Sequence, residues 1–511
     1  MNLPKSNDDV YDYLDLAPSD IGTNLFNADS TKYRITCRVG NIRSKVADSL
    51  KVQVQDIFND VFRDGKQEVL VSGSTLLALR TQGFLIRDLT TSFILAFIII
   101  FISMIVLFRS VRLSIISILP VIFILGSAII NLFIIVLDII FIFEIFLKKE
   151  IKYLNNRYFY SLIVFWFILL INLSFSISFH DSVPRSLGFI RFVFFALAIN
   201  YYLNNSDNKY KNFIFKIWTI TFFLISLDLI YEYIFGLNTF GYKSYMPGRL
   251  SGFFNQELKI GHLYSALILI CLSFVYLFLK EKKISNNNFI FLIIKRNIFY
   301  FFLVLFLFVS IIIGERSNFI KTLLMSVFFL FLLENYNYRK KIFSIFLGLL
   351  ILTMIILNNE SYKYRFWTMF IKPIINNPVE MIIKSNYGSH YKVAIEVFNN
   401  YKLTGVGLKN YRKEVTKDGY SKNPSTHPHQ THFEILSETG LIGYFSFLLL
   451  FLFNLFSAAR YFIKKRNIYQ LAGTLYVFVN LIPLIPSGSF FTSYGAALFW
   501  LNFGLMLPKN E

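Results

Sequence analysis

Long apolar runs dominate this sequence and constrain its fold more than any other feature. Runs of about 17 to 24 apolar residues recur along most of the chain, each long enough to cross a hydrocarbon core of about 30 Å as a helix. Hydrophobic residues make up 55% of the 511 positions, and Phe alone occurs 60 times. The pattern therefore predicts an integral membrane protein, and no alternation along the runs suggests a β-barrel.

We predict an all-α polytopic membrane protein with about 13 transmembrane helices. The expected spans are residues 93–108, 113–130, 132–147, 158–179, 187–203, 213–236, 261–279, 297–313, 320–334, 342–358, 441–457, 469–486 and 491–507. A long loop at 359–440 separates the tenth span from the eleventh. Residues 1–90 combine an alternating stretch at 33–39 with a helical pattern at 46–62, which predicts a small α+β soluble segment.

The basic residues favour membrane topology over nucleic-acid binding. The net charge is +20, but Lys and Arg lie mainly in short clusters between the apolar runs. These clusters fall on alternate loops, which the positive-inside rule assigns to the cytoplasm, so the 359–440 loop is expected on the opposite side. Cys37 and Cys271 are the two cysteines, too few for a disulfide framework or a cysteine metal site.

Two arginines on that opposite side have the chemistry of an anion site. Arg249 follows Gly248, and Arg316 lies in the sequence Gly-Glu-Arg-Ser-Asn at a membrane edge. A guanidinium group offers a planar fork of donors and a permanent charge, which suit a phosphate or diphosphate. An arginine at a helix end also commonly contacts lipid headgroups, and this alternative stays open for each residue taken singly.

Three histidines precede the eleventh apolar run: His427, His429 and His432. A neutral histidine can accept a proton from a hydroxyl group, which is the work of a general base. The three side chains can also converge on zinc, although no cysteine supports such a site. At the level of the backbone the stretch predicts a helix start, with the helix stopping at Gly440.

The histidine stretch carries a family resemblance. His429-Gln430, nine further residues and then Gly440-x-x-Gly443 is similar to the signature of the O-antigen ligase and polymerase family of membrane glycosyltransferases. The sequence Gly-Val-Gly-Leu-Lys-Asn-Tyr at 405–411 and the settings of the two arginines resemble the same family, over about residues 132–511. Where ligases end the signature with two threonines, this chain has Tyr444 and Phe445, so ligase and polymerase both stay open.

The resemblance implies a metal-independent inverting glycosyltransferase without a cofactor. It would move a glycan from an undecaprenyl-diphosphate-linked donor to a lipid A-core or glycan acceptor, in lipopolysaccharide or surface polysaccharide biosynthesis. The active site would face the periplasm from the bacterial inner (cytoplasmic) membrane. Arg249 and Arg316 would bind the diphosphate, and His429 would act as the base. His427 and His432 would shape the site or contact the acceptor, and Glu438 is a further candidate.

Arg191 lies inside a predicted span, where a charged side chain is costly and tends to face a partner or a cavity. Asp228 and Glu232 on the next span are the candidate partners. Either an ion pair with one of them or a contact with the donor would account for this arginine.

Residues 10–130 resemble a different family. Val-Ser-Gly-Ser-Thr at 71–75, Leu-Phe-Arg-Ser-Val-Arg-Leu at 107–113 and Ile-Leu-Pro at 118–120 are similar to part of the resistance-nodulation-division exporter superfamily, including MMPL-like members. The predicted domains are thus a porter-like fragment at 1–90, two exporter-like helices at 91–131 and a ligase-like domain at 132–511. A transporter or flippase is the rival function, and it predicts critical charges along a path inside the bilayer.

Overall fold

The computed structural model describes residues 44–61, 97–255, 257–281, 289–333, 338–420 and 425–509, together with residues 91 and 95. The described residues form helices and contain no strand. The helices are α3 (Ser44–Val61), α5 (Val111–Ile122), α6 (Ser127–Leu147), η1 (Ile151–Tyr153), α7 (Arg157–Leu173), α8 (Phe179–Gly188), α9 (Ile190–Asn205), α10 (Asn208–Phe235), η2 (Gly252–Phe254), α11 (Ile260–Glu281), α12 (Phe289–Ile312), α13 (Arg316–Leu332), α14 (Tyr338–Asn358), α15 (Glu360–Tyr362), η3 (Lys363–Ile371), α16 (Lys372–Asn376), α17 (Pro378–Lys384), α18 (Asn386–Asn400), α19 (Tyr411–Glu414), α20 (Thr431–Lys465), α21 (Ile468–Asn480) and α22 (Ser493–Met506).

Several of these helices are long and apolar enough to cross a membrane. Five such segments occur among the described residues: Ser127–Leu147, Phe179–Asn205, Asn208–Phe235, Ile260–Lys280 and Thr431–Lys465. Shorter apolar helices accompany them at Phe97–Phe108, Val111–Ile122, Arg157–Leu173 and Asn297–Ile312. The chain is therefore an all-α multi-pass membrane protein, while the number of about 13 spans stays a prediction.

Each predicted span overlaps a helix, but one of them was wrong as a continuous segment. The span expected at 113–130 is interrupted, because α5 ends at Ile122 and α6 begins at Ser127. Gly126 between them has a φ of +107°, a conformation that other residues rarely adopt. Hydropathy cannot detect this break, since the residues around Gly126 are themselves apolar.

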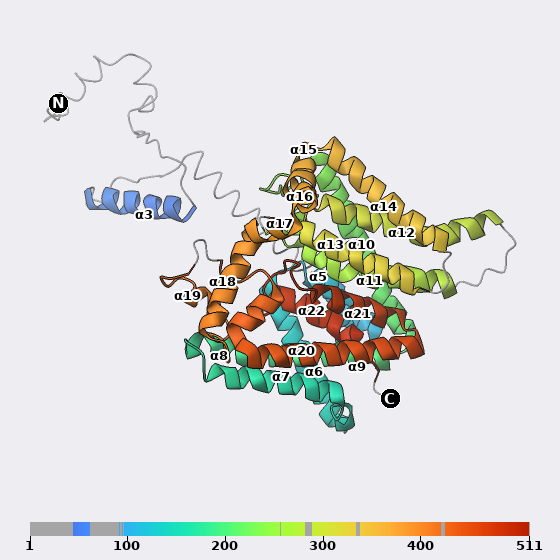
Figure 1. Cartoon of the computed structure of the whole chain (residues 1–511), viewed down its shortest axis with the longest axis horizontal. Coiled ribbons are helices and arrows are strands. Elements are labelled where there is room, and N and C mark those ends of the chain that lie inside the picture. Colours follow the sequence, from blue (N-terminus) through green and yellow to red (C-terminus); the bar gives the residue numbers. More distant parts are fainter. Residues whose placement is uncertain are drawn as a thin grey trace, which may run out of the picture. The chain divides into compact units, whose positions relative to one another are not determined.

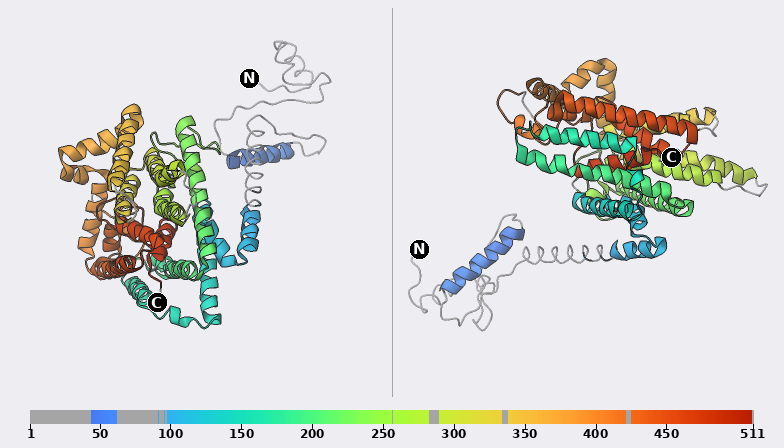
Figure 2. Two further views of the ribbon diagram at one scale, coloured as in Figure 1. Left: turned by 90° about the vertical axis from the view of Figure 1, so that its right-hand side faces the viewer. Right: turned by 90° about the horizontal axis from the view of Figure 1, so that it is seen from below.

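The centre of the bundle in residues 100–511 is built around α22. This helix packs against α9, α21, α11 and α6, and its Trp500 is fully buried. The views agree that α21 and α22 lie inside, with α14 and the short helices after it at the edge (Figure 1, Figure 2). With 13 and 14 residues, α21 and α22 span about 20 Å each, less than the hydrocarbon thickness.

The segment expected as a loop at 359–440 is largely helical. It contains α15, η3 and α16 to α19, and α18 packs against α17 and α20. The hydropathy argument missed these helices because they are short and carry Lys and Arg. Several of their apolar side chains are exposed, including Trp367, Met369, Ile375, Val379 and Ile383.

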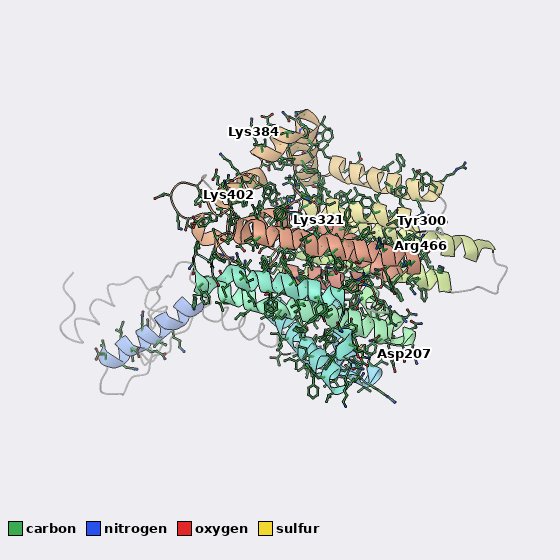
Figure 3. All side chains as sticks on the ribbon, turned by 60° about the horizontal axis from the view of Figure 1, so that its bottom comes forward. Asp207, Tyr300, Lys321, Lys384, Lys402 and Arg466 are labelled. Carbon is green, nitrogen blue, oxygen red and sulfur yellow. The ribbon has the colours of Figure 1, made fainter. Side chains whose placement is uncertain are left out.

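Labelled residues of the 359–440 segment and of two other loops lie toward opposite ends of the bundle. Lys384 and Lys402, in the 359–440 segment, lie toward one end, and Asp207 and Arg466 lie toward the other (Figure 3). Arg466 belongs to one of the clusters expected in the cytoplasm, and Asp207 precedes another in the sequence. Which membrane the chain occupies, and which end faces the cytoplasm, stay predictions.

Contacts divide the chain into residues 1–99 and 100–511. In the first unit, α3 confirms the helical pattern expected at 46–62. The strand-like stretch expected at 33–39 lies outside the described residues, as does most of the porter-like fragment. The predicted domain boundaries at 90 and 131 stay predictions.

Candidate active site

The backbone brings the two arginine motifs side by side. The amide of Leu250 donates a hydrogen bond to the carbonyl of Ile313 at 3.1 Å. A Cβ atom at Gly314 would lie only 2.9 Å from the carbonyl carbon of Gly248 and 3.1 Å from Cα of Arg249. Gly314 also has a φ of +76°. Glycine is therefore required here both for the backbone conformation and for the close approach.

A buried carboxylate fixes the segment that follows Arg249. Glu232 of α10 is 2% exposed and accepts hydrogen bonds from the amides of Ser251 at 2.9 Å and Gly252 at 2.8 Å. The hydroxyl of Ser251 also donates to it, at 3.1 Å. These bonds satisfy the buried charge and anchor the backbone two residues after the arginine.

Both predicted arginines are held at the same place. Arg249 forms an ion pair with Glu315 through Nη2, which also donates to the carbonyl of Leu258 at 3.2 Å. Arg316 is the first residue of α13, and its Nη1 donates to the carbonyl of Met369 at 3.2 Å. The charge of Arg249 acts on Arg316. The structure thus brings Arg249 and Arg316 together.

Arg365 is a third arginine at this site, and the sequence reasoning missed it. Its Nε and Nη2 donate to the carbonyl of Gly314 at 3.3 and 3.1 Å. Burial, followed by the positive charges of Arg249 and Arg316, lowers the pKa of Arg365 to about 10. Three like charges gathered without an equal number of carboxylates are the arrangement expected of an anion site. In the sequence Arg365 is one of many basic residues of the 359–440 segment, with no neighbouring glycine to mark it.

His429 lies in a cluster of rings just before α20. Its ring centroid is 4.0 Å from that of His427, 5.1 Å from His390 and 5.8 Å from Tyr387. Its Nε2 is 3.0 Å from Oγ of Ser425, so a hydroxyl group fits beside this nitrogen. The backbone of His429 has a φ of +57°, which is uncommon for a residue with a side chain and occurs at functional sites.

The environment of His429 keeps its imidazole neutral. Burial, and then the charge of His390, lowers the pKa of His429 to about 4. Burial and the charges of His429, Arg412 and Arg185 also lower the pKa of His427 to about 4. A neutral imidazole at physiological pH is the form that can accept a proton. His390 belongs to α18, and no sequence pattern connected it with the histidine stretch.

Tyr387 connects the two groups of side chains. It lies on α18, with its ring edge-on to His429 at 5.8 Å. Its phenol is also close enough to Arg316 to act on the guanidinium electrostatically. Arg316 and His429 are therefore both near one aromatic side chain.

His432 lies apart from the other two histidines of the stretch. Its Nε2 is 2.7 Å from the carbonyl of Leu481, so this nitrogen carries the proton and donates. Its Nδ1 is 3.2 Å from the hydroxyl of Tyr444, which donates to it. Both ring nitrogens have protein partners, which suits His432 to joining α20 with the α21–α22 connection. These partners argue against the alternative zinc site of His427, His429 and His432, and no group of three His, Cys, Asp or Glu side chains in the described residues has an arrangement that could hold a metal ion.

The glycines of the histidine signature allow two backbones to touch. Gly440 has φ +63° and ψ −164°, which is not helical, so the first stretch of α20 stops there as expected and a second stretch continues beyond the kink to Lys465. A Cβ at Gly440 would lie 2.5 Å from the amide nitrogen of Thr404, and one at Gly405 would lie 2.6 Å from the carbonyl oxygen of Glu438. The amide of Gly407 donates to that same carbonyl at 2.8 Å. The 405–411 segment is thereby attached to α20 at the kink.

Glu438 stabilises this junction from inside. Its side chain is 3% exposed, and the backbone amides of Lys409 and Tyr411 interact with its carboxylate. Arg185 of α8 forms an ion pair with it at 3.9 Å. The charge of Arg185 also reaches His427, so Glu438 positions the neighbourhood of the histidines.

Arg191 is placed away from these groups. Its Nη1 donates to the carbonyl of Gly188 at 3.0 Å, and its guanidinium lies 4.5 Å from the ring centroid of Phe192. The carboxylate that acts on it is Asp138 of α6. The expected partners were wrong: Asp228 accepts from the amide of Thr239 at 2.9 Å, and Glu232 anchors the Arg249 segment.

Comparison with known proteins adds one finding at the level of sequence families. No curated protein matches the chain, and nothing supports the exporter-like resemblance of residues 10–130, which stays a prediction. The segment from residue 301 in α12 to residue 448 in α20, just after the kink, includes Arg316, Arg365 and His429. This segment, residues 301–448, matches the family model for O-antigen ligase.

Proposed function

We propose that this protein is a membrane glycosyltransferase of the O-antigen ligase type. It moves a glycan from an undecaprenyl-diphosphate donor to an acceptor hydroxyl at the periplasmic face of the bacterial inner membrane. The observation that carries the proposal is the gathering of three arginines at one site, with Tyr387 in reach of both Arg316 and the neutral His429. The family match over residues 301–448 supports the same class of reaction.

The arginines bind the donor and stabilise the leaving group. As the bond between the anomeric carbon and the diphosphate oxygen breaks, negative charge builds on the diphosphate. Arg249, Arg316 and Arg365 present donors that are already fixed by the protein, so little reorganisation is needed at the moment of reaction. Their combined charge can perform the role that a divalent cation performs in other enzymes acting on diphosphates.

His429 activates the acceptor. The hydroxyl oxygen of the acceptor attacks the anomeric carbon while its proton passes to the imidazole of His429. The new glycosidic bond forms on the face opposite the departing diphosphate, so the anomeric configuration inverts. Each transfer releases one undecaprenyl diphosphate and one proton, which His429 returns to water.

Ligase and polymerase differ in the acceptor and not in this chemistry. A lipid A-core acceptor makes the protein a ligase, and a second lipid-linked glycan makes it a polymerase. Tyr444, which replaces a threonine of the ligase signature, bonds to His432 beside the site. Offering the two acceptors to the same membranes distinguishes the two activities.

The proposal is tested by glycan transfer in membranes that contain the wild type, His429→Ala or His432→Gln. We expect His429→Ala to lose about 10²- to 10⁴-fold in rate, the usual contribution of a general base. His432→Gln should keep most of the activity, since its ring nitrogens already have protein partners. Wild-type activity should persist in EDTA. Unchanged transfer by His429→Ala would refute the catalytic role, and donor movement across vesicles without transfer would favour the transporter.

A further inference from the structure

Arg249 is not free in the structure to bind a diphosphate with its full charge. Its guanidinium is paired with the carboxylate of Glu315, and the two side chains are only 16% and 13% exposed. The other carboxylate oxygen of Glu315 accepts a hydrogen bond from Nδ2 of Asn318 at 2.5 Å. A diphosphate that approaches Arg249 therefore meets a carboxylate already in place.

The approach of the donor would leave Glu315 in an unfavourable state. Two anions beside one guanidinium repel each other, and a mostly buried carboxylate that loses its partner is costly. Donor binding thus depends on another positive charge that can compensate Glu315. The proposed function assigns Arg316 and Arg365 to the diphosphate itself, so the compensating group must be another cation.

Lys321 has the properties that such a group requires. It lies on α13, in the middle part of the bundle (Figure 3), and is 1% exposed. Its Nζ donates to Oδ1 of Asn480 at 3.1 Å, so its hydrogen-bond partner in the described part of the chain is a neutral amide. The negative charge of Glu315 acts on this ammonium group. A buried charge inside a membrane domain without a charged partner calls for a functional explanation.

Asn318 links the carboxylate of Glu315 to His262. Nδ1 of His262, at the start of α11, is 3.3 Å from Nδ2 of Asn318. The charges of Glu315, Lys321 and Arg249 all act on His262. Gly261 leaves room for the carboxylate, since a Cβ there would lie 2.9 Å from its carbon and closer to one of its oxygens.

We propose that Lys321 is the alternative counterion of Glu315. When the diphosphate of the donor occupies Arg249, Glu315 exchanges the guanidinium for the ammonium of Lys321, and Arg249 gains its full charge for the donor. The inference rests on the proposed function, because it takes Arg249 as a diphosphate ligand. Lys321 acts through Glu315 and is a positioning residue.

The test compares steady-state transfer by Lys321→Gln, Glu315→Gln and the double variant. In Lys321→Gln, the KM for the lipid-linked donor should rise about 5- to 150-fold, the usual range for coupling between linked sites, while kcat changes little. In the double variant this rise should disappear, because no carboxylate needs compensation. A merely structural lysine would not produce such a selective and reversible effect on KM.

Lys341→Gln provides a matched control, because Lys341 is also buried, at 6% exposure, and bonds to the carbonyl of Leu333. Its donor KM should stay at the wild-type value. If Lys321→Gln does not fold, Glu315→Gln alone decides: a KM equal to or below that of the wild type supports the proposal, and a raised KM overturns it. A Lys321→Gln defect that persists in the Glu315→Gln background also overturns it. Arg249→Gln separates the two hypotheses, since unimpaired transfer by this variant rejects the proposed function itself.

Discussion

Replacement of Gly314 by alanine should separate the two arginine motifs and disable the site. The added methyl group would lie 2.9 Å from the carbonyl carbon of Gly248 and closer still to its oxygen, whereas real Cβ atoms essentially never come within 3.0 Å of another heavy atom. The two segments must then move apart by on the order of 1 Å, because backbone cannot yield as a side chain can. A misplacement of about 1 Å in a catalytic arrangement can reduce the rate about 100-fold.

Gly236→Ala is the control that isolates the close approach. Gly236 has a φ of +75°, nearly that of Gly314, but a Cβ there would meet nothing within 4 Å. Both variants pay the same conformational cost of about 1 to 2 kcal/mol. Donor-dependent transfer, measured as kcat/KM on purified protein of known thermal stability, should fall about 100-fold for Gly314→Ala and little for Gly236→Ala. Equal activities in the two variants would refute the reasoning that the contact between 248 and 314 sets the arginine geometry.

Three further predictions concern individual side chains. Since the pKa of His429 is lowered to about 4, its neutral base form predominates above that pH. The value of kcat/KM should therefore stay level from pH 7 to about 5 and fall as the pH drops through about 4. A fall in kcat/KM centred near pH 6.5 would contradict this environment of His429. Arg365→Gln should raise the donor KM about 10- to 150-fold, the value of a hydrogen bond to a charged group. The wild-type KM should rise near pH 10, where Arg365 loses its charge, and this rise should be absent from the variant. A wild-type KM in this variant would remove Arg365 from the site. Trp367 is 44% exposed on η3 and should contact the lipid interface. Its fluorescence, taken as the difference between the wild type and Trp367→Phe, should be quenched by brominated lipids. The absence of quenching would place Trp367 in water.

The parts of the fold that hydropathy determines were predictable. A helix that crosses a membrane needs a continuous apolar run, and each predicted span overlaps a helix. The interruption at Gly126 was not predictable in this way, because a left-handed glycine leaves no trace in a hydropathy average. The helices at 359–440 were not predicted because they are too short and too polar to form a continuous apolar run.

The roles of the predicted site residues stay predictions, but the placement of several of them follows from topology. Arg249, Arg316 and His429 lie in segments on the side opposite the basic clusters, so topology alone predicts that they share one end of the bundle. Arg365, His390 and Tyr387 belong to the 359–440 segment, and their contact with the other residues depends on how that segment packs. Sequence spacing left His432 open as a zinc ligand beside His427 and His429, although α20 begins at Thr431 and the ring of His432 bonds to the carbonyl of Leu481.

The glycines of both motifs allow close contacts between backbones, and these contacts position the functional side chains beside them. Gly314 lies against Gly248, and Gly405 lies against the kink at Gly440, in each case at a distance that a Cβ atom would forbid. Contacts between backbones fix the positions of Cα atoms directly, whereas contacts between side chains can adapt through rotamers. The arginines and the histidine are therefore placed by the backbone, and the remaining adjustment falls to charges such as Glu315 and Lys321. An exchange of Glu315 between Arg249 and Lys321 requires that the surrounding backbone stays in place.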